Sequence, residues 1–356
     1  MRSGVTITQV AERAGVGVAT VSRVLNSSPR VSRPTRERVL EAIDELGYAP
    51  NAAARALSTG RTRTIGVIAP FFTQSSVVER LRGVSTAVAA AGYQLVLFDV
   101  EGPDRFIDLA AGGRLDGLIC VSLCPSPEEL RRFEAAGVPV ALVDAEHPRL
   151  AGVSIDDVAG GRLATEHLIE LGHRRIGFVG DDEDSPFGFT SSARRRLGAE
   201  TAATAAGARL VVRRGAHGGQ EARRMAAELL ALEERPTAVF AGSDRQALGV
   251  LEAAEDAGFR VPEDLSVVGF DDVEVARYAG LTTVAQPLEE SGERGAKLLL
   301  GSLEGNGGGT ERLGLRLIVR RTTAPPPGTA RQEGVMWDQS LATGRRGMKC
   351  PDVSQY

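Results

Sequence analysis

The stretch that decides the fold of the N-terminal part of the chain is VTITQVAERAGVGVATVSRVLN, residues 5–26. Its first half repeats apolar residues at the spacing of an amphipathic helix, with Thr6 or Thr8 as the N-cap. The segment 15–17 then breaks the pattern with two glycines, and a second helix is predicted over residues 18–25. The apolar faces are formed by Ile7, Val10, Ala11 and Ala14 in the first helix and by Val21, Val24 and Leu25 in the second.

A third helix is predicted behind the first two. Ser32 is its N-cap, Pro34 falls in its first turn, and Gly47 ends it. Two helices separated by a short glycine-containing turn, with a third behind them, form a helix-turn-helix DNA-binding layout, which we assign to residues 1–49. The predicted buried stripe of the third helix is Val39, Leu40, Ile43 and Leu46.

The segment GVGVAT, residues 15–20, has a second interpretation, because it resembles the start of a dinucleotide-binding glycine loop. Such a loop follows a β-strand and opens a helix. Here the segment follows a helix, and no β-pattern precedes it. We therefore reject the dinucleotide-binding interpretation.

Charge is distributed unevenly along the chain. The net charge is −4, yet the first 63 residues hold ten arginines and five acidic residues, so that they carry +5 and the remainder carries −9. A small basic head on an acidic body favours a polyanionic partner such as a nucleic acid. Chance clustering in an arginine-rich chain is the alternative.

From Ile65 onward the pattern changes to apolar runs bounded by turn residues. The runs IGVIAP, YQLVLFDV, DGLICVS and VPVALVD are separated by helix-compatible stretches, which is typical of buried parallel strands in βα units. The alternation resumes after residue 156, so we expect an α/β core of two doubly wound lobes, 65–156 and 157–285. The second lobe is predicted to contain the strands RIGFVG, ARLVVR, TAVFAG and LSVVGF and helices near 192–206, 219–232 and 244–257.

Ligands of doubly wound lobes bind beyond the carboxyl ends of the strands. Asp144 closes one strand, Asp244 opens the helix after another, and Asp271 ends a third. Their carboxylates suit a polyhydroxylated ligand in a cleft between the lobes. The pair Asp271–Asp272 has a structural alternative, in which one of the two caps the following helix. The candidate apolar walls of the cleft are Phe71, Phe72 and Phe270.

The C-terminal part carries weaker signals. Residues 286–323 are predicted to form a crossover and one closing strand, RLGLRLIVRRT. We expect residues 324–356 to be a flexible tail.

Several classes of protein are excluded by what the chain lacks. No apolar run approaches the ~20 residues that span a bilayer, and the N-terminus lacks the apolar stretch of a secretory signal. The three cysteines, at positions 120, 124 and 350, form no CxxC pair, so neither a disulfide framework nor a zinc site is expected. The expectation is a cytoplasmic protein that contacts no membrane and has no metal or cofactor.

The chain resembles the lactose-repressor (LacI/GalR) family of bacterial transcription factors in VTITQVAERAGVGVATVSRVLN and VSRPTRERVLEAIDELGYAPNAAARAL. The resemblance continues in IGVIAP, VSIDDVAGGRLATEHLIELGHRRIGFVG, PTAVFAGSDRQALGVLEAAEDAGFRVPEDLSVVGFDD and LTTVAQPL, and it covers about residues 5–323. It implies a homodimer that binds a palindromic operator in double-stranded DNA, represses genes of sugar or carbon metabolism and responds to a sugar-like effector. It also implies a core like that of periplasmic sugar-binding proteins.

In this family the second helix of the head enters the major groove, and Val18, Ala19 and Arg23 match the base-reading positions. Arg23 can donate two hydrogen bonds to guanine, and Val18 and Ala19 can contact a thymine methyl. The alternative is that Val18 and Ala19 are packing residues. The DNA-binding residues implied in the head also include Thr6, Thr20, Ser22 and Asn26, of which the last three match backbone-contacting positions.

Residues 50–64 resemble the hinge helix and linker of the family. An isolated helix under ~12 residues is marginal in water, so we expect this one to fold only beside its dimer mate over DNA. Leu57 matches the leucine that enters the minor groove, the alternative being an ordinary exposed apolar residue. The implied DNA-binding residues around this segment are Tyr48, Asn51, Ala54, Arg55 and Leu57.

For the effector cleft the resemblance adds three residues. Arg196, in SSARRRL, matches the ligand-binding arginine, although the neighbouring Arg194 and Arg195 leave the register open. Ser243 stands where the family often has asparagine, and Gln286 matches a position at the cleft rim.

Three classes of function compete. An enzyme would need chemistry that the chain does not display, because it contains neither GxxxxGK[ST] nor GxSxG and its four histidines are scattered. A solute receptor would carry a signal peptide and lack a basic head. We therefore predict an effector-responsive transcriptional repressor and not an enzyme.

Overall fold

The computed structural model describes residues 5–25, 28–48, 61–98, 114–182 and 188–328. The N-terminal head consists of the helices α1 (Ile7–Ala14), α2 (Val18–Leu25) and α3 (Arg33–Leu46). Thr6 begins α1 with a capping box, since its Oγ1 accepts the Gln9 N–H while the Gln9 side chain accepts the Thr6 N–H. Gly47 ends α3 at a φ of 60°, a left-handed conformation that favours glycine. The helix-turn-helix prediction is confirmed.

The head has its own small core, and one predicted member is absent from it. Leu40 is 46% exposed, so the prediction that it belongs to the buried stripe is wrong. Successive residues of a helix point about 100° apart, which turns Leu40 away from the face of Val39 and gives the inward place to Ala42. Ile43 and Leu46 are partly buried against a core formed by Val10, Ala11, Ala14, Val21, Val24, Val39 and Ala42.

Lobe 1 contains a six-stranded parallel sheet in the order β11-β5-β4-β3-β1-β2. Helices cover both of its faces: α5 (Ser75–Ala90) and α13 (Leu288–Leu303) pack on one core cluster, and α7 (Pro127–Ala135) packs on another. The strands are β1 (Thr64–Ile68), β2 (Gln94–Phe98), β3 (Gly117–Val121), β4 (Val140–Val143), β5 (Ala151–Ile155) and β11 (Thr310–Leu313).

Lobe 2 repeats this strand order as β12-β10-β9-β8-β6-β7, with only the edge strand β12 antiparallel. Its strands are β6 (Arg175–Asp181), β7 (Arg209–Gly215), β8 (Ala238–Ala241), β9 (Ser266–Asp271), β10 (Thr282–Ala285) and β12 (Arg316–Ile318). Its helices are α8 (Asp157–Glu170), α9 (Ser191–Ala205), α10 (Gly219–Leu230), α11 (Asp244–Asp256) and α12 (Glu274–Ala279).

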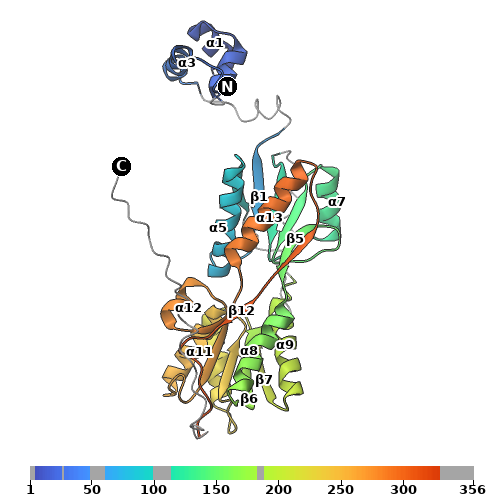
Figure 1. Cartoon of the computed structure of the whole chain (residues 1–356), viewed down its shortest axis with the longest axis vertical. Coiled ribbons are helices and arrows are strands. Elements are labelled where there is room, and N and C mark those ends of the chain that lie inside the picture. Colours follow the sequence, from blue (N-terminus) through green and yellow to red (C-terminus); the bar gives the residue numbers. More distant parts are fainter. Residues whose placement is uncertain (1–4, 26–27, 49–60, 99–113, 183–187, 329–356) are drawn as a thin grey trace, which may run out of the picture.

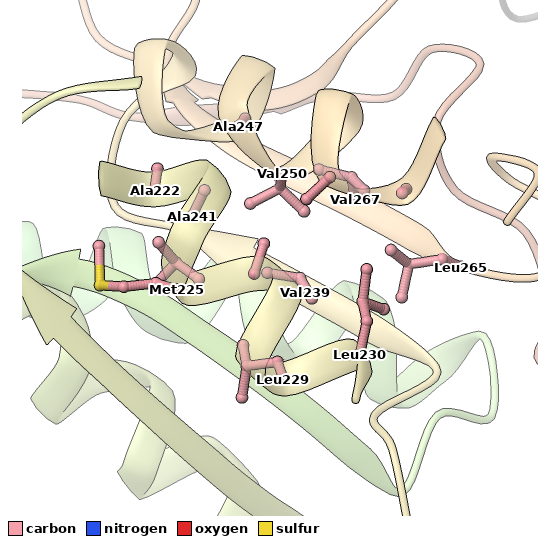
Figure 2. Close-up of a cluster of buried hydrophobic side chains, with 14 of the residues drawn as sticks. Ala222, Met225, Leu229, Leu230, Val239, Ala241, Ala247, Val250, Leu265 and Val267 are labelled. Atoms are coloured by element: carbon pink, nitrogen blue, oxygen red, sulfur yellow. The ribbon is translucent and has the colours of Figure 1, made fainter. Parts of the chain in front are cut away.

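The core of lobe 2 is a pair of apolar layers, one on each face of the sheet. Figure 2 shows the layer between α10, α11 and the strands β8 and β9, where Met225, Leu229 and Val250 meet Val239. The opposite layer holds Phe178, Phe240 and Phe270 beneath α8 and α9. Both lobes are therefore doubly wound, as predicted.

The two lobes are stacked end to end in Figure 1, and the chain crosses between them three times: after β5, between β10 and α13, and between β11 and β12. The prediction of one closing strand over 312–322 is wrong. That segment divides near Gly314, because β11 pairs with β5 in lobe 1 while β12 pairs with β10 in lobe 2. In the part of the chain that the structure describes, no helix combines the length and apolar character that a membrane span requires.

Candidate DNA-binding head and effector cleft

Helix α2 presents two different faces. Val21 and Val24 are buried in the head core, whereas Val18, Ala19 and Arg23 lie on the exposed side, with Val18 43% exposed. The exposed side of α2 therefore presents these three side chains to solvent, where they are accessible to a partner. The remaining described candidates of this helix, Thr20 and Ser22, are partly buried beside them.

The other candidates for DNA contact are distributed around the head. Thr6 caps α1, and Tyr48 is partly buried against the head core just after α3. Five candidates lie outside the described residues, namely Asn26, Asn51, Ala54, Arg55 and Leu57.

A cleft of about 590 Å³ lies between the two lobes, within the range of small-molecule sites. It opens at the carboxyl ends of β1, β3 and β4 in lobe 1 and of β6, β8 and β9 in lobe 2. Each sheet changes the direction of its strand order between its first and third strands along the chain, β1 and β3 in lobe 1 and β6 and β8 in lobe 2. The cleft lies at both of these switch points, where doubly wound folds bind ligands. Of the predicted effector residues, the cleft is lined by Phe71, Asp144, Ser243, Asp271 and Gln286.

The backbone around the cleft is strained. Phe71, Ser122, Asp144 and Asp271 all line it with left-handed φ values, of 53°, 58°, 60° and 120°. Residues with a Cβ adopt this conformation at a free-energy cost and persist in it where the surrounding fold holds them, often at functional sites. The strained turns aim these side chains across the strand ends into the cleft.

A chain of polar contacts connects the lobes through Arg80, which is buried on α5. Its Nη2 lies 3.0 Å from Asp144 Oδ1 and donates to Gln286 Oε1 at 2.9 Å, and Ser122 Oγ donates to the other Asp144 oxygen at 2.8 Å. Gln286 Nε2 donates in turn to Asp271 Oδ1. These contacts join Asp144 of lobe 1 to Asp271 of lobe 2. The Arg80 Nε has no hydrogen-bond partner among the described residues.

Arg195 is a buried cation of lobe 2. Its Nε donates to Asp157 Oδ1 at 2.8 Å, its Nη1 donates to the Gly242 carbonyl at 2.6 Å, and its guanidinium lies 3.8 Å from the centroid of the Phe270 ring. Asp271 Oδ1 is 3.9 Å from the same guanidinium. Arg195 is therefore held by four groups at the floor of the cleft.

Arg196 was predicted to occupy that position, and this prediction is wrong by one residue. Neighbouring residues of a helix point about 100° apart, so Arg196 turns out of the cleft and pairs with Glu200 on α9. Arg194, on the other side of Arg195, reaches the cleft rim, where its Nη1 lies 3.6 Å from Glu146 Oε2 of lobe 1.

Three further effector predictions are corrected by burial. Phe270 is fully buried beneath Arg195, and Phe72 packs against the core of lobe 1, so neither is a wall of the cleft. Asp244 is fully buried, where it accepts hydrogen bonds from Thr283 Oγ1 at 2.5 Å and from the Val273 N–H at 3.0 Å. It joins structural elements of lobe 2 instead of facing a ligand.

Burial shifts the pKa of two carboxylates of the cleft, Asp271 and Asp157. It raises the pKa of Asp271, and the nearby cations Arg195 and Arg80 offset this only in part. It likewise raises the pKa of Asp157, against the opposing effect of Arg195. Keeping these buried carboxylates ionised therefore lowers the stability of the fold. Carboxylates with such perturbed pKa values are typical of functional sites.

The structure adds lining residues that the sequence analysis missed. Phe71 of lobe 1 faces two rings of lobe 2: His217, stacked at 6.5 Å between centroids, and Phe189, tilted at 6.1 Å. Asp181 holds His217 through Nδ1 at 3.0 Å and accepts from Gln246 Nε2 at 2.7 Å. Asp181 follows a predicted strand as Asp144 does, so the same rule could have found it. Arg80 and Asp157 carried no comparable signal.

A helix-turn-helix head joined to two lobes around a polar cleft defines a ligand-responsive DNA-binding regulator. Residues 6–51 match the family described as bacterial regulatory proteins, lacI family, and residues 165–323 match the periplasmic binding protein-like domain. The chain belongs to the lacI family. It is a helix-turn-helix transcriptional repressor with an effector-binding core, and not an enzyme.

The similarity to individual relatives extends over most of each chain. The HTH-type transcriptional regulator CelR of Thermobifida fusca is 37% identical over 89% of this chain and 98% of its own length. The structure of a CelR–cellobiose complex is 33% identical over 89% of this chain and 99% of that chain, with a TM-score of 0.66. The crystal structure of the Lac repressor dimer bound to operator and the anti-inducer ONPF is 29% identical over 90% of this chain and 100% of that chain, with a TM-score of 0.78.

Proposed function

We propose that this repressor binds a palindromic operator as a homodimer and releases or engages it in response to a neutral, sugar-like effector in the inter-lobe cleft. The observation that carries the proposal is the polar chain from Asp144 through Arg80 and Gln286 to Asp271, which links both lobes at their ligand-binding edges. A ligand that replaces these contacts changes how the lobes meet. Its regulated genes are those of sugar or carbon metabolism, and it acts in the cytoplasm, where the chromosome lies.

The charges of the cleft favour a neutral effector. Three arginines face five carboxylates, and each arginine already pairs with at least one of them. A phosphorylated or carboxylated sugar would add negative charge to an acidic cleft without a cation to receive it. Hydroxyl groups suit the carboxylates as donors, and the rings of Phe71 and His217 suit the apolar face of a sugar ring. The cellobiose complex of CelR supports this class of ligand.

The dimer is supported by an exposed apolar patch that spans both lobes. Val78 on α5 and Val275 and Tyr278 on α12 are 40%, 39% and 76% exposed and border one groove of about 370 Å³. Glu79, Arg82 and Glu274 line the same groove, and a second copy of this surface can cover it around a two-fold axis. A two-fold dimer matches a palindromic operator.

In the proposed DNA complex α2 lies in the major groove. Arg23 reads a guanine, and Val18 and Ala19 contact a thymine methyl. Thr6, Thr20, Ser22, Asn26 and Tyr48 contact the DNA backbone. The hinge residues Asn51, Ala54, Arg55 and Leu57 meet the minor groove at the operator centre.

A binding experiment on the full chain tests the function. An operator is first selected from random double-stranded DNA, and its affinity is measured by fluorescence anisotropy with and without cellobiose, glucose, ribose or glucose 6-phosphate. We expect a selected palindrome and at least one neutral sugar that changes operator affinity. Failure to select any sequence would overturn the DNA-binding assignment, and a response to glucose 6-phosphate alone would overturn the neutral-effector assignment.

A further inference from the structure

The start of the core is fastened to lobe 1 mainly at Asp116 and at the end of α13, and Arg61 Nη1 also donates to the Tyr93 hydroxyl at 3.3 Å. The Asp116 carboxylate accepts hydrogen bonds from the Thr62 N–H at 2.7 Å, the Thr62 hydroxyl at 2.9 Å and the Arg63 N–H at 2.8 Å. Arg61 Nη2 donates to the carbonyl of Leu303 at 2.9 Å. Residues 61–63 are the first described residues of the core after the DNA-binding head, and these contacts hold them on lobe 1.

The second fastening point is the C-terminal end of α13. Leu303 is the last residue of this helix, and its carbonyl belongs to the helix end that carries partial negative charge. A guanidinium is the donor that best suits this position. Arg61 therefore caps α13 from a segment more than two hundred residues away in the chain.

The opposite end of α13 lies at the effector cleft. The helix begins at Leu288, two residues after Gln286, which contacts Arg80 and Asp271 in the cleft. Sixteen residues at 1.5 Å each give a rod of about 24 Å between the cleft and Arg61. Figure 1 shows α13 rising from the junction of the lobes, beside α5, to the end of lobe 1 where β1 begins.

Helices α13 and α5 are in backbone contact, so neither can shift without the other. A Cβ added to Gly83 on α5 would overlap the Glu289 carbonyl oxygen of α13, and one added to Gly292 would overlap the Arg80 carbonyl oxygen of α5. Packing this close is possible only where both positions are glycine. Because α5 carries Arg80 and α13 follows Gln286, the two helices form one body with both cleft residues at its end.

We propose that α13 connects the effector cleft to the DNA-binding head, and that Arg61 is the positioning residue that fastens the linker to its far end. A change in the contacts of Gln286 moves the start of α13, and Arg61 passes this movement to residues 61–63. The part of this connection that runs from Gln286 to residues 61–63 lies within the core and can be tested without DNA. Only the test that measures operator binding rests on the proposed function.

Hydrogen–deuterium exchange of the full-length protein without effector or DNA tests the connection. Gln286→Ala should speed exchange of the Thr62 and Arg63 amides several-fold, because the cleft end of α13 loses two hydrogen bonds. In an Arg61→Ala background the same substitution should add little, since the far end is already released. Arg61→Lys should restore part of the response. Gln220→Ala, a surface glutamine on α10, is the matched control and should change nothing at residues 62–63.

Two results would overturn the connection. One is an unchanged exchange rate at Thr62 and Arg63 in Gln286→Ala while the amides around the cleft do change. The other is a Gln286→Ala effect of equal size with and without Arg61. If Gln286→Ala melts far below the wild type, Gln286→Glu replaces it in the same cycle.

Measurements of operator affinity then distinguish a failure of this inference from a failure of the proposed function. With any sugar that changes operator affinity of the wild type, Arg61→Ala should bind that sugar within about twofold of the wild type, by calorimetry, and lose most of the operator response. Arg132→Ala, on the exposed face of α7, should keep the full response. A wild type that responds to no sugar would contradict the proposed effector class and leave the exchange result standing.

Discussion

Arg195 Nε donates a hydrogen bond to Asp157 Oδ1 across 2.8 Å, with both side chains buried at the floor of the cleft. The pair joins the start of α8, where the chain enters lobe 2, to the second turn of α9. Its neighbour Arg196 pairs with Glu200 on the same helix and outside the cleft. Two adjacent arginines thus provide a matched test of the site.

Arg195→Ala should destabilise the fold by ~3–5 kcal/mol and abolish effector binding, because it leaves Asp157 buried without its cation. Arg196→Ala should change stability by less than about 1 kcal/mol and leave effector binding intact, since its ion pair is partly exposed. Urea unfolding and calorimetry with a responsive sugar measure both. Equal losses of sugar affinity in the two variants would contradict the placement of Arg195.

Asp271→Asn should raise the melting temperature at pH 7 and weaken effector binding. Burial raises the pKa of Asp271 in the fold, so the native state holds its proton at a pH where the unfolded chain has released it. The ionised carboxylate therefore lowers stability as the pH rises through the folded pKa, and the amide removes this effect. The advantage of the variant should shrink toward pH 4. A variant that melts lower than the wild type at pH 7 would show that ion pairing outweighs burial.

His173 should make the protein less stable in mild acid. Its ring is buried, with Nδ1 2.8 Å from Thr237 Oγ1 and Nε2 2.9 Å from the Ala324 carbonyl, and burial lowers its pKa. The unfolded chain then binds the proton first, so stability is present above the unfolded value of about 6.5 and is lost as the pH falls below it.

Urea unfolding between pH 7.5 and 5 measures this loss. His173→Gln should be less stable at pH 7.5 and should show a flatter pH dependence. His147→Gln, in a loop of lobe 1, is the control for the replacement of a histidine by glutamine. A parallel loss in His173→Gln and the wild type would exclude His173 as the source.

Tyr278→Ala should weaken the proposed dimer by about tenfold or more, as expected for an exposed aromatic residue that the second copy buries. Sedimentation equilibrium measures the dissociation constant. Val319→Ala is the matched control, because Val319 is 57% exposed but lies outside the patch of Val78, Val275 and Tyr278. A dissociation constant for Tyr278→Ala equal to that of the wild type would show that the dimer interface does not include this patch.

Arg23→Ala should weaken operator binding by ~1–3 kcal/mol and relax the preference for one guanine in each half-site. Arg33→Ala, whose guanidinium pairs with Glu37 on α3, should leave base preference unchanged. Selection of operators by each variant provides the comparison. An unaltered guanine preference in Arg23→Ala would mean that another side chain reads that base.

The elements that local chemistry determines were predictable from the sequence. Thr6 begins α1 and Gly47 ends α3 through contacts within a few residues. The predicted second helix, over residues 18–25, matches α2. The strands of the lobes were predictable because each is a short apolar run between turns. The exposed face of α2 followed from the burial of Val21 and Val24.

The errors arose where the answer depended on distant parts of the chain. Three consecutive arginines do not indicate which of them lies on the cleft side of α9. Only the packing of α9 against α8 decides that Arg195 faces the cleft. Asp244 and Asp144 both follow strands, yet Asp244 is enclosed by Thr283 and Val273, which arrive later in the chain. The break near Gly314 depends on pairing with β5 and β10, which no local pattern reveals.

The three crossings between the lobes also set an order of events during synthesis. The edge strands β11 and β12 come from residues 310–318, after all the other described strands of the two sheets. The head can fold as soon as it leaves the ribosome, whereas β5 and β10 each remain an exposed sheet edge until these residues emerge. Such an edge can pair with another chain and so promote aggregation. A nascent chain that stalls before residue 310 would therefore carry a folded DNA-binding head on two unfinished sheets.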